Sequence, residues 1–191
     1  MYSYPRSAII KQVQNRVPDY MYPSTAPWAV VSERHLNAEL CDHILESNMH
    51  EDIYSFQNCG AETRECTQPL DSSLNPISGF LVAVNQTYWQ YVLGDMPGAW
   101  LQTYRESDKY QLHMDGTLGQ TRKLTAIAML TDPGEYAGGD LILHIPPNSF
   151  AVPKTQGTIV VFPHWVLHQV TEIKSGIRQT INLGYWGPPF R

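Results

Sequence analysis

Two segments in the first half of the chain carry apolar residues at helical spacing. The first follows Asn37, whose side chain is suited to cap a helix, and it predicts a helix over residues 38–46. The second begins at Asn75, the predicted N-cap, with Pro76 in the first turn. Its apolar positions continue to Tyr91 and are typical of a helix face that packs on a core.

Three other segments before residue 123 have no helical pattern. The short apolar run at residues 28–31 predicts a strand. Residues 55–73 are polar and unpatterned, which predicts a long loop that could act as a flap over a site. Residues 116–122 contain two glycines and are a second candidate for a loop that closes.

Beyond residue 99 the pattern changes to short apolar runs separated by turn signals such as Asp132-Pro133-Gly134. Short strands in such close succession fit a jelly roll, or double-stranded β-helix, a β fold of two facing sheets. We therefore predict a single domain that is mainly β with helices (α+β). Residues 1–99 would supply supporting helices and the flap loop, and residues 100–188 the jelly-roll core. The predicted strands are residues 100–105, 110–115, 123–131, 141–145, 150–152, 158–162, 167–173 and 178–185.

Composition and charge limit the classes of partner. Hydrophobic residues make up 42% of the chain and charged residues 16%, and the net charge is −5, which is typical of a globular protein. Lysine and arginine form no long run, so we expect no nucleic-acid partner. The apolar stretches are too short to span a bilayer, so we expect no membrane partner.

The three cysteines bear on the compartment. Cys41, Cys59 and Cys66 cannot all pair within the chain. Cys59 and Cys66 share one loop-like segment and could pair with each other, but reduced thiols of the cytosol are the better fit. The N-terminal residues contain no apolar run of signal length. We therefore predict a cytoplasmic protein.

Four polar residues of the second half form the most informative pattern. His113 and Asp115 are one residue apart, so in a strand both point to the same face. With His168 they give two imidazoles and one carboxylate, a ligand set for Fe(II) that leaves coordination positions open. Arg178 follows with a planar fork suited to a carboxylate. These residues together suggest an iron oxygenase that uses a 2-oxo acid as co-substrate.

The sequence alone leaves other roles open for these residues. His144 and His164 are alternatives to His168 as the distal ligand, on a different strand and in a predicted turn, respectively. Arg178 could instead be an ion-pair partner of Glu172 or Asp140. Such pairing would make the arginine a structural residue.

The last predicted strand has one polar and one apolar face. Arg178, Thr180 and Asn182 alternate with apolar residues, so they share one side of the strand. We expect the apolar side to meet the helices and the polar side to line the interior of the roll. Because a buried charge is costly unless it is matched, an arginine in that interior suggests a bound anion.

These motifs resemble those of the prolyl 4-hydroxylase-like branch of the 2-oxoglutarate/Fe(II) dioxygenases, including its bacterial and phage members. The resemblance covers roughly residues 100–188, and its most specific segment runs from His168 to Arg178. It implies Fe(II) bound by His113, Asp115 and His168, with 2-oxoglutarate and O2 as co-substrates and ascorbate as a candidate reductant. The matching segments are residues 104–115, 136–141, 157–162 and 168–178.

The resemblance also implies how the co-substrate would be held. The distal carboxylate of 2-oxoglutarate would pair with Arg178, and Tyr104 and Thr180 are candidate donors to the same group. Tyr110 matches a tyrosine of the family as well. Simple strand alternation places Tyr110 opposite His113, so it ranks below Tyr104.

The substrate is less well indicated than the cofactors. Family precedent implies hydroxylation of a C–H bond, most often of a prolyl residue in a peptide or protein, with release of succinate and CO2. A free amino acid or another small molecule is an alternative, and so is a cupin-like metalloprotein without 2-oxo acid chemistry. A non-catalytic binding module is a third class. Trp186 could line the mouth of the site or pack at a sheet edge, and the host compartment would be the cytosol of a bacterium or of a phage-infected cell.

Overall fold

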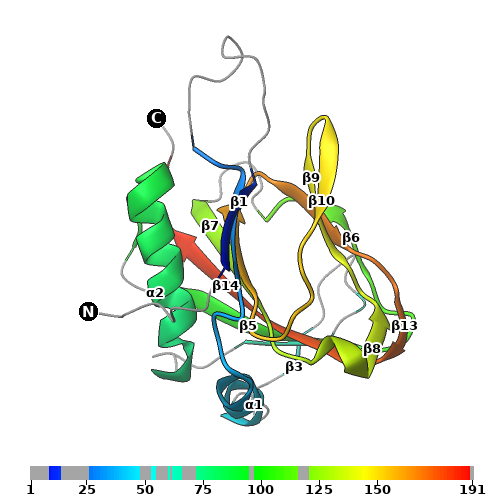
Figure 1. Ribbon diagram of the computed structural model, residues 1–191. Coiled ribbons are helices and arrows are strands. Elements are labelled where there is room, and N and C mark those ends of the chain that lie inside the picture. Colours follow the sequence, from blue (N-terminus) through cyan, green and yellow to red (C-terminus); the bar gives the residue numbers. More distant parts are fainter. Residues whose placement is uncertain are drawn as a thin grey trace.

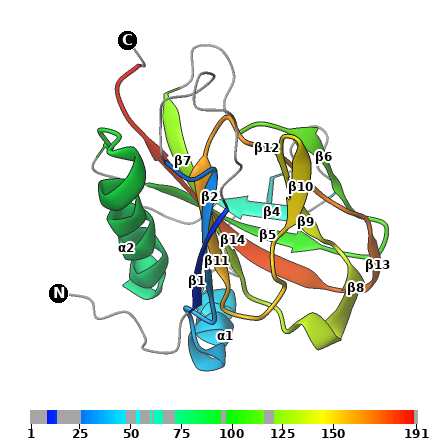
Figure 2. The same cartoon turned by 45° about the horizontal axis from the view of Figure 1, so that its top comes forward.

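Two antiparallel sheets face each other and form the body of the fold (Figures 1 and 2). The computed structural model describes residues 9–13, 26–47, 53–54, 60, 62–65, 72–94, 97–115 and 121–189. The larger sheet has the order β1 (Ile9–Val13), β2 (Ala29–Glu33), β11 (Ile159–Pro163), β7 (Arg122–Met129), β14 (Arg178–Trp186), β5 (Gly98–Tyr104), β4 (Glu62–Glu65) and β3 (Ile53–Tyr54). The smaller sheet has the order β10 (Asn148–Ala151), β9 (Leu141–Ile145), β12 (Leu167–Val170) and β6 (Tyr110–His113). A short pair, β8 (Tyr136–Gly138) and β13 (Ile173–Gly176), adjoins them.

One apolar layer lies between the two sheets. Val160 and Phe162 of β11 pack in the same buried cluster as Leu143 of β9 and Val170 of β12. Burying such a side chain stabilises the fold by roughly 1.5–3 kcal/mol relative to leaving it exposed. The predicted fold class, a mainly β double-stranded β-helix with a few helices, is confirmed.

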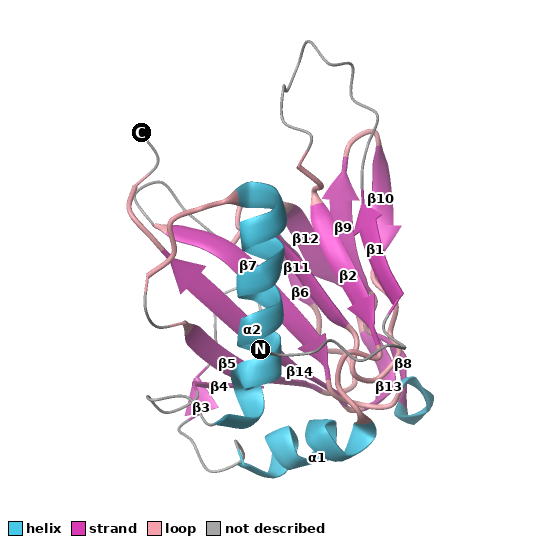
Figure 3. Cartoon of the chain, turned by 60° about the vertical axis from the view of Figure 1, so that its left-hand side comes forward, coloured by secondary structure: helices cyan, strands magenta, loops and turns pink. Residues whose placement is uncertain are grey.

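A second apolar layer lies on the outer face of the larger sheet. Helix α2 (Asn75–Val84) lies across this face, as Figure 3 shows. Ile77 and Leu81 of the helix share a buried cluster with Ile181 and Leu183 of β14. The apolar side of β14 therefore meets a helix, as the alternation of its sequence predicts.

Helix α1 (Ala38–Ser47) matches the first predicted helix and its cap. The backbone N–H of Leu40 donates a hydrogen bond of 2.9 Å to Oδ1 of Asn37. Cys41 and Ile44 are buried, so the apolar stripe faces the core. Cys41 is a free thiol, and burial and the nearby Asp42 raise its pKa to about 12.

Replacing Asn37 by Ala should lower the free energy of unfolding by about 1 kcal/mol, because the N–H of Leu40 would lose its acceptor. Asn37→Ser keeps a capping oxygen and should stay close to the wild type. Urea denaturation of the two variants measures the difference. Equal midpoints for Ala and Ser would contradict a capping role for this residue.

The second helix begins differently from the prediction. The N-cap of α2 is Leu74, not Asn75, and no side chain caps this end. The reason is that a 3₁₀ turn, η1 (Ser72–Leu74), runs directly into the helix, so Asn75 already lies in the first turn. After α2 the chain continues in a π-helical turn, η2 (Asn85–Trp89).

The predicted flap at residues 55–73 is wrong in its described parts. Residues 62–65 form β4, which pairs with both β3 and β5, and η1 occupies its end. The strand was missed because Glu-Thr-Arg-Glu lacks the apolar alternation by which strands are recognised. The rest of this segment, with Cys59 and Cys66, lies outside the described residues, as does most of the loop predicted at 116–122.

Three further features of the second half were not predicted. The strand β8 has only three residues, and the predicted strand at 167–173 is divided into β12 and the start of β13. A 3₁₀ turn, η3 (Pro133–Glu135), precedes β8.

Among the described helices, none combines the length and apolar character needed to cross a membrane.

Candidate metal centre and adjoining cavity

Three of the predicted site residues converge between the sheets. His113 ends β6, His168 lies in β12, and the two residues are paired across the ladder. Asp115 follows β6 in a bend, where its N–H donates to the carbonyl of His164 at 3.0 Å. One ligand atom of each of the three residues lies within 4.8 Å of those of the other two. The structure therefore brings together the predicted set of two imidazoles and one carboxylate.

Hydrogen bonds orient both imidazoles of this cluster. Nδ1 of His113 lies 2.7 Å from the carbonyl oxygen of Gln111, and Nδ1 of His168 lies 2.9 Å from that of Val166. A carbonyl can only accept, so each Nδ1 carries the proton and donates it. In the neutral form of each imidazole, Nε2 then carries the lone pair, and these atoms lie 3.6 and 3.7 Å from Oδ1 of Asp115.

The two oxygens of Asp115 have different surroundings. Oδ1 faces the imidazoles, whereas Oδ2 accepts a hydrogen bond from the hydroxyl of Thr125 and lies 3.7 Å from Nη2 of Arg122. Burial alone would raise the pKa of this carboxyl. Arg122, His168, His113 and Thr125 outweigh burial and hold the pKa below its usual range, so the group is an anion.

Opposing effects also act on the distal histidine. Burial lowers the pKa of His168 and is only partly opposed by Asp115. The rival histidines do not join the cluster: His144 has its Nδ1 3.1 Å from the hydroxyl of Ser149, in the β9–β10 hairpin. His164 contributes its backbone carbonyl to Asp115 and is also outside the cluster.

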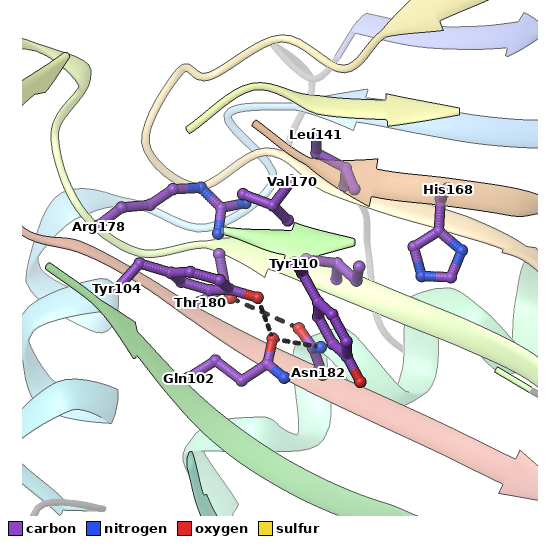
Figure 4. Close-up of a pocket in the computed structure, with 10 residues that line it drawn as sticks. Gln102, Tyr104, Tyr110, Leu141, His168, Val170, Arg178, Thr180 and Asn182 are labelled. Carbon is purple, nitrogen blue, oxygen red and sulfur yellow. Dashed lines mark hydrogen bonds between the residues drawn. The ribbon is translucent and has the colours of Figure 1, made fainter. Parts of the chain in front are cut away.

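A cavity adjoins the cluster on the side of β14. Figure 4 shows Arg178 at one side of this cavity and His168 at the other. Hydrogen bonds connect the polar groups between them: the hydroxyl of Tyr104 and Nδ2 of Asn182 both donate to Oε1 of Gln102, at 2.9 and 2.8 Å. The other lining residues are Tyr110, Ile127, Leu141, Val170 and Thr180.

Arg178 is a buried cation without a carboxylate partner in the described chain. Its exposed fraction is 1%, and its Nε and Nη1 make no hydrogen bond with the described residues. Its guanidinium lies over the ring of Tyr104, 5.0 Å from the centroid, and Nη2 is 3.5 Å from Sδ of Met129. Burying such a charge is costly unless an anion compensates it, and the guanidinium lines this cavity, where an anion could reach it.

The alternative of a structural ion pair for Arg178 does not hold. Glu172 pairs with Lys174 at 2.6 Å, and Asp140 pairs with Lys154 at 2.9 Å. Both carboxylates are therefore already paired with lysines, on the surface or near it.

Tyr110 lies on the same side as His113, against the prediction from strand alternation. Their rings stack with centroids 3.9 Å apart, and Tyr110 lines the cavity. The cause is a β-bulge: the four residues from Tyr110 to His113 lie opposite only three, from Val170 to His168. The extra residue in β6 turns Tyr110 to the inner face.

The other predicted site residues are placed as follows. Tyr104 and Thr180 line the cavity, although the hydroxyl of Tyr104 already donates to Gln102. Trp186, the predicted substrate residue, packs at the far end of β14 against Trp100 and does not line the cavity. Its role in substrate binding stays a prediction.

Sequence reasoning did not find Arg122, Thr125 or Gln102. All three are common polar residues on strands, and no spacing rule connects them with the ligands. The signal for Gln102 was available, because it lies two residues before Tyr104 and therefore shares its face.

The fold and the cluster define a class: a double-stranded β-helix with two histidines and one aspartate between its sheets. Residues 99–186 match the model of the 2OG-Fe(II) oxygenase superfamily. This part of the chain is similar to that superfamily, in agreement with the resemblance of its motifs.

Similar proteins are found among curated sequences and solved structures. A PKHD-type hydroxylase of Prochlorococcus marinus is 33% identical over 75 residues, which is 38% of this chain and 34% of the relative. The chain therefore spans about a third of the length of the curated relatives it matches.

Two solved structures show the same fold over most of the chain. A Pseudomonas putida prolyl-4-hydroxylase has a TM-score of 0.70 at 15% identity and covers 86% of this chain and 95% of its own. A prolyl hydroxylase of Trichoplax adhaerens, in complex with a hypoxia inducible factor peptide fragment, has a TM-score of 0.67 at 13% identity, with 83% of each chain covered.

Proposed function

We propose that this protein is an Fe(II)- and 2-oxoglutarate-dependent dioxygenase that hydroxylates a C–H bond of a prolyl residue in a peptide or protein. The observation that carries the proposal is the buried Arg178, which has no carboxylate partner among the described residues, in a cavity whose other side is formed by His168 of the cluster. A cationic fork and a two-histidine, one-carboxylate set that share a cavity suit a 2-oxo acid, which can bind at both ends.

The donor set of the cluster fits Fe(II). Each imidazole presents a free Nε2 lone pair, and Asp115 supplies one charged oxygen, Oδ1. His113, Asp115 and His168 would hold the ion on one side and leave the other side open. When bound, the iron would couple the decarboxylation of 2-oxoglutarate, to succinate and CO2, with the oxidation of the substrate by O2.

The residues of the cavity would bind and orient the co-substrate. Arg178 would pair with the distal carboxylate, and Thr180, which is 1% exposed, lies on the same face of β14 and would donate to it. The ring of Tyr104 supports the guanidinium from below, and its hydroxyl would have to leave Gln102 to donate to the co-substrate. Tyr110, stacked on His113, would close the cavity from the side of β6.

The substrate class rests on the relatives. The two solved structures described above are prolyl hydroxylases, and one of them holds a peptide fragment, which supports a peptide or protein as substrate. We further propose that residues 1–99 support the core at 100–188, since β1 to β4 extend its larger sheet. A cytosolic location, in a bacterium or a phage-infected cell, would keep the iron and Cys41 reduced.

Anaerobic addition of Fe(II) and 2-oxoglutarate to the apo-protein tests the cofactors. We expect a visible metal-to-ligand charge-transfer band that requires both components, because the 2-oxo acid would chelate the bound ion. Iron binding without this band would favour a cupin-like metalloprotein instead. The absence of iron binding would favour a non-catalytic binding module.

A peptide screen then tests the substrate class. Proline-containing peptides, each matched with a peptide that has alanine in place of proline, are incubated with the loaded enzyme. We expect some of the proline peptides alone to stimulate succinate release and to gain one oxygen atom by mass. Stimulation by free amino acids but by no peptide would contradict a peptidyl substrate.

A further inference from the structure

Arg122 contacts two tryptophans beside the candidate metal centre. Its guanidinium carbon is 5.5 Å from the ring centroid of Trp100 and 5.6 Å from that of Trp186. The two indoles meet each other edge to face, with centroids 5.8 Å apart. Arg122 opens β7, Trp186 ends β14, and Trp100 lies in β5, so three adjacent strands build this arrangement. We call these three side chains the Arg122 clamp.

A pair of glycines provides the space for the clamp. Gly98 and Gly184 lie directly opposite each other on β5 and β14. A Cβ atom on Gly184 would lie 2.7 Å from Nε of Arg122, and a Cβ atom on Gly98 would lie 2.7 Å from the indole of Trp100. Any larger residue at either position would displace the guanidinium or the indoles.

The clamp directs Arg122 at one atom of the cluster. Nη2 of Arg122 lies 3.7 Å from Oδ2 of Asp115, the oxygen that also accepts from Thr125. Arg122 and Thr125 would point to opposite faces in a regular strand. A register shift opposite Tyr185 and Trp186 gives β7 one extra residue and brings both side chains to the same oxygen.

We propose that Arg122 is a positioning residue that reserves Oδ2 of Asp115, so that Oδ1 alone is presented to the metal, and that Trp100 and Trp186 hold Arg122 in that position. The proposal rests on the proposed iron centre. A carboxylate can bind a metal through one oxygen or two, and a second bound oxygen would take a position that the co-substrate or O2 needs. The indoles restrict the long arginine side chain and add cation–π attraction, so its charge stays on Oδ2.

Metal affinity and coordination test this role without any turnover. Apo-protein is titrated anaerobically with Co(II), whose visible absorption reports both affinity and coordination number. Arg122→Met keeps the length and apolar contacts but removes the charge, and we expect roughly 10–100-fold weaker binding and a changed Co(II) spectrum. Arg122→Lys keeps a charge without the planar fork and should fall between Met and wild type. Arg34→Met, at an exposed position, is the matched control.

The outcomes separate this inference from the proposed function. A wild-type protein that binds no Co(II) and forms no band with Fe(II) and 2-oxoglutarate would overturn both. A wild-type protein that binds normally, with Arg122→Met within about twofold of it and the same spectrum, would overturn the positioning role alone. Should Arg122→Met fail to fold, the milder Arg122→Lys decides by the same criterion.

The tryptophans are tested by a second pair of variants. Trp186→Leu removes an aromatic face from Arg122 without touching a ligand, and we expect Co(II) binding to weaken severalfold. Trp186→Phe keeps an aromatic face and should bind more tightly than Trp186→Leu. Equal, wild-type affinity of both variants would overturn the clamp.

Discussion

Replacing His168 by Gln is expected to abolish tight binding of a divalent metal while the protein stays folded. Glutamine is close to histidine in size, and its amide can still donate to the carbonyl of Val166, which now accepts from Nδ1. Its neutral amide oxygen is a much weaker ligand for such an ion than the imidazole Nε2, which lies 3.7 Å from Oδ1 of Asp115. We expect affinity to fall by more than the roughly 10–100-fold that is usual when only the partner of a ligand is lost.

The measurement is an anaerobic titration with Mn(II), followed by calorimetry and by the rise in melting temperature that a bound ion causes. His144→Gln is the matched control, because His144 lies on the neighbouring strand and is paired with Leu167, the residue before His168. That control should bind like the wild type. If the two variants lose affinity equally, His168 has no special role as a ligand.

The second large effect concerns the co-substrate. Arg178→Met should weaken 2-oxoglutarate binding by roughly 100-fold or more, because truncating one partner of a buried charged pair costs about 2–5 kcal/mol. The same change should leave the stability of the apo-protein unaltered or raise it, since it removes a charge that has no carboxylate partner among the described residues. The affinity for 2-oxoglutarate is therefore expected to fall, while the free energy of unfolding of the apo-protein stays the same or rises.

Titration of the charge-transfer band with 2-oxoglutarate gives the affinity, and urea denaturation of the apo-protein gives the stability. Met129→Leu, which removes the sulfur near Nη2 but keeps the charge, serves as the control and should bind 2-oxoglutarate almost normally. An Arg178→Met variant with unchanged affinity but reduced stability would show that the arginine is a structural residue.

Much of the candidate site could be predicted because its residues follow simple rules of period and chemistry. His113 and Asp115 were expected together from their spacing, and the two faces of β14 from its alternation. The metal cluster needed only that distant strands lie side by side, which the jelly roll provides. The residue types, two histidines, one aspartate and one arginine, then indicated iron and a 2-oxo acid, which no single helix or strand could indicate.

What was missed follows from irregularity in the strands. The bulge in β6 turned Tyr110 to the inner face, and the bulge in β7 brought Arg122 to Asp115. Strand alternation assumes one residue per step, so each bulge reverses the expected direction of the side chains beyond it. The strand β4 was missed for a different reason: its polar sequence joins a sheet through backbone hydrogen bonds, which leave no pattern in the side chains.

The two faces of β14 contact different parts of the protein, so substitutions on one face should affect different properties from substitutions on the other. Ile181 and Leu183 contribute to the core under α2, while Arg178 and Thr180 face the cavity. Substitutions on the helix side would alter stability with little influence on the ligands bound, and substitutions on the cavity side would do the reverse. An engineer could therefore first repack the helix side to gain a margin of stability, and then use that margin to reshape the cavity for a different oxo acid.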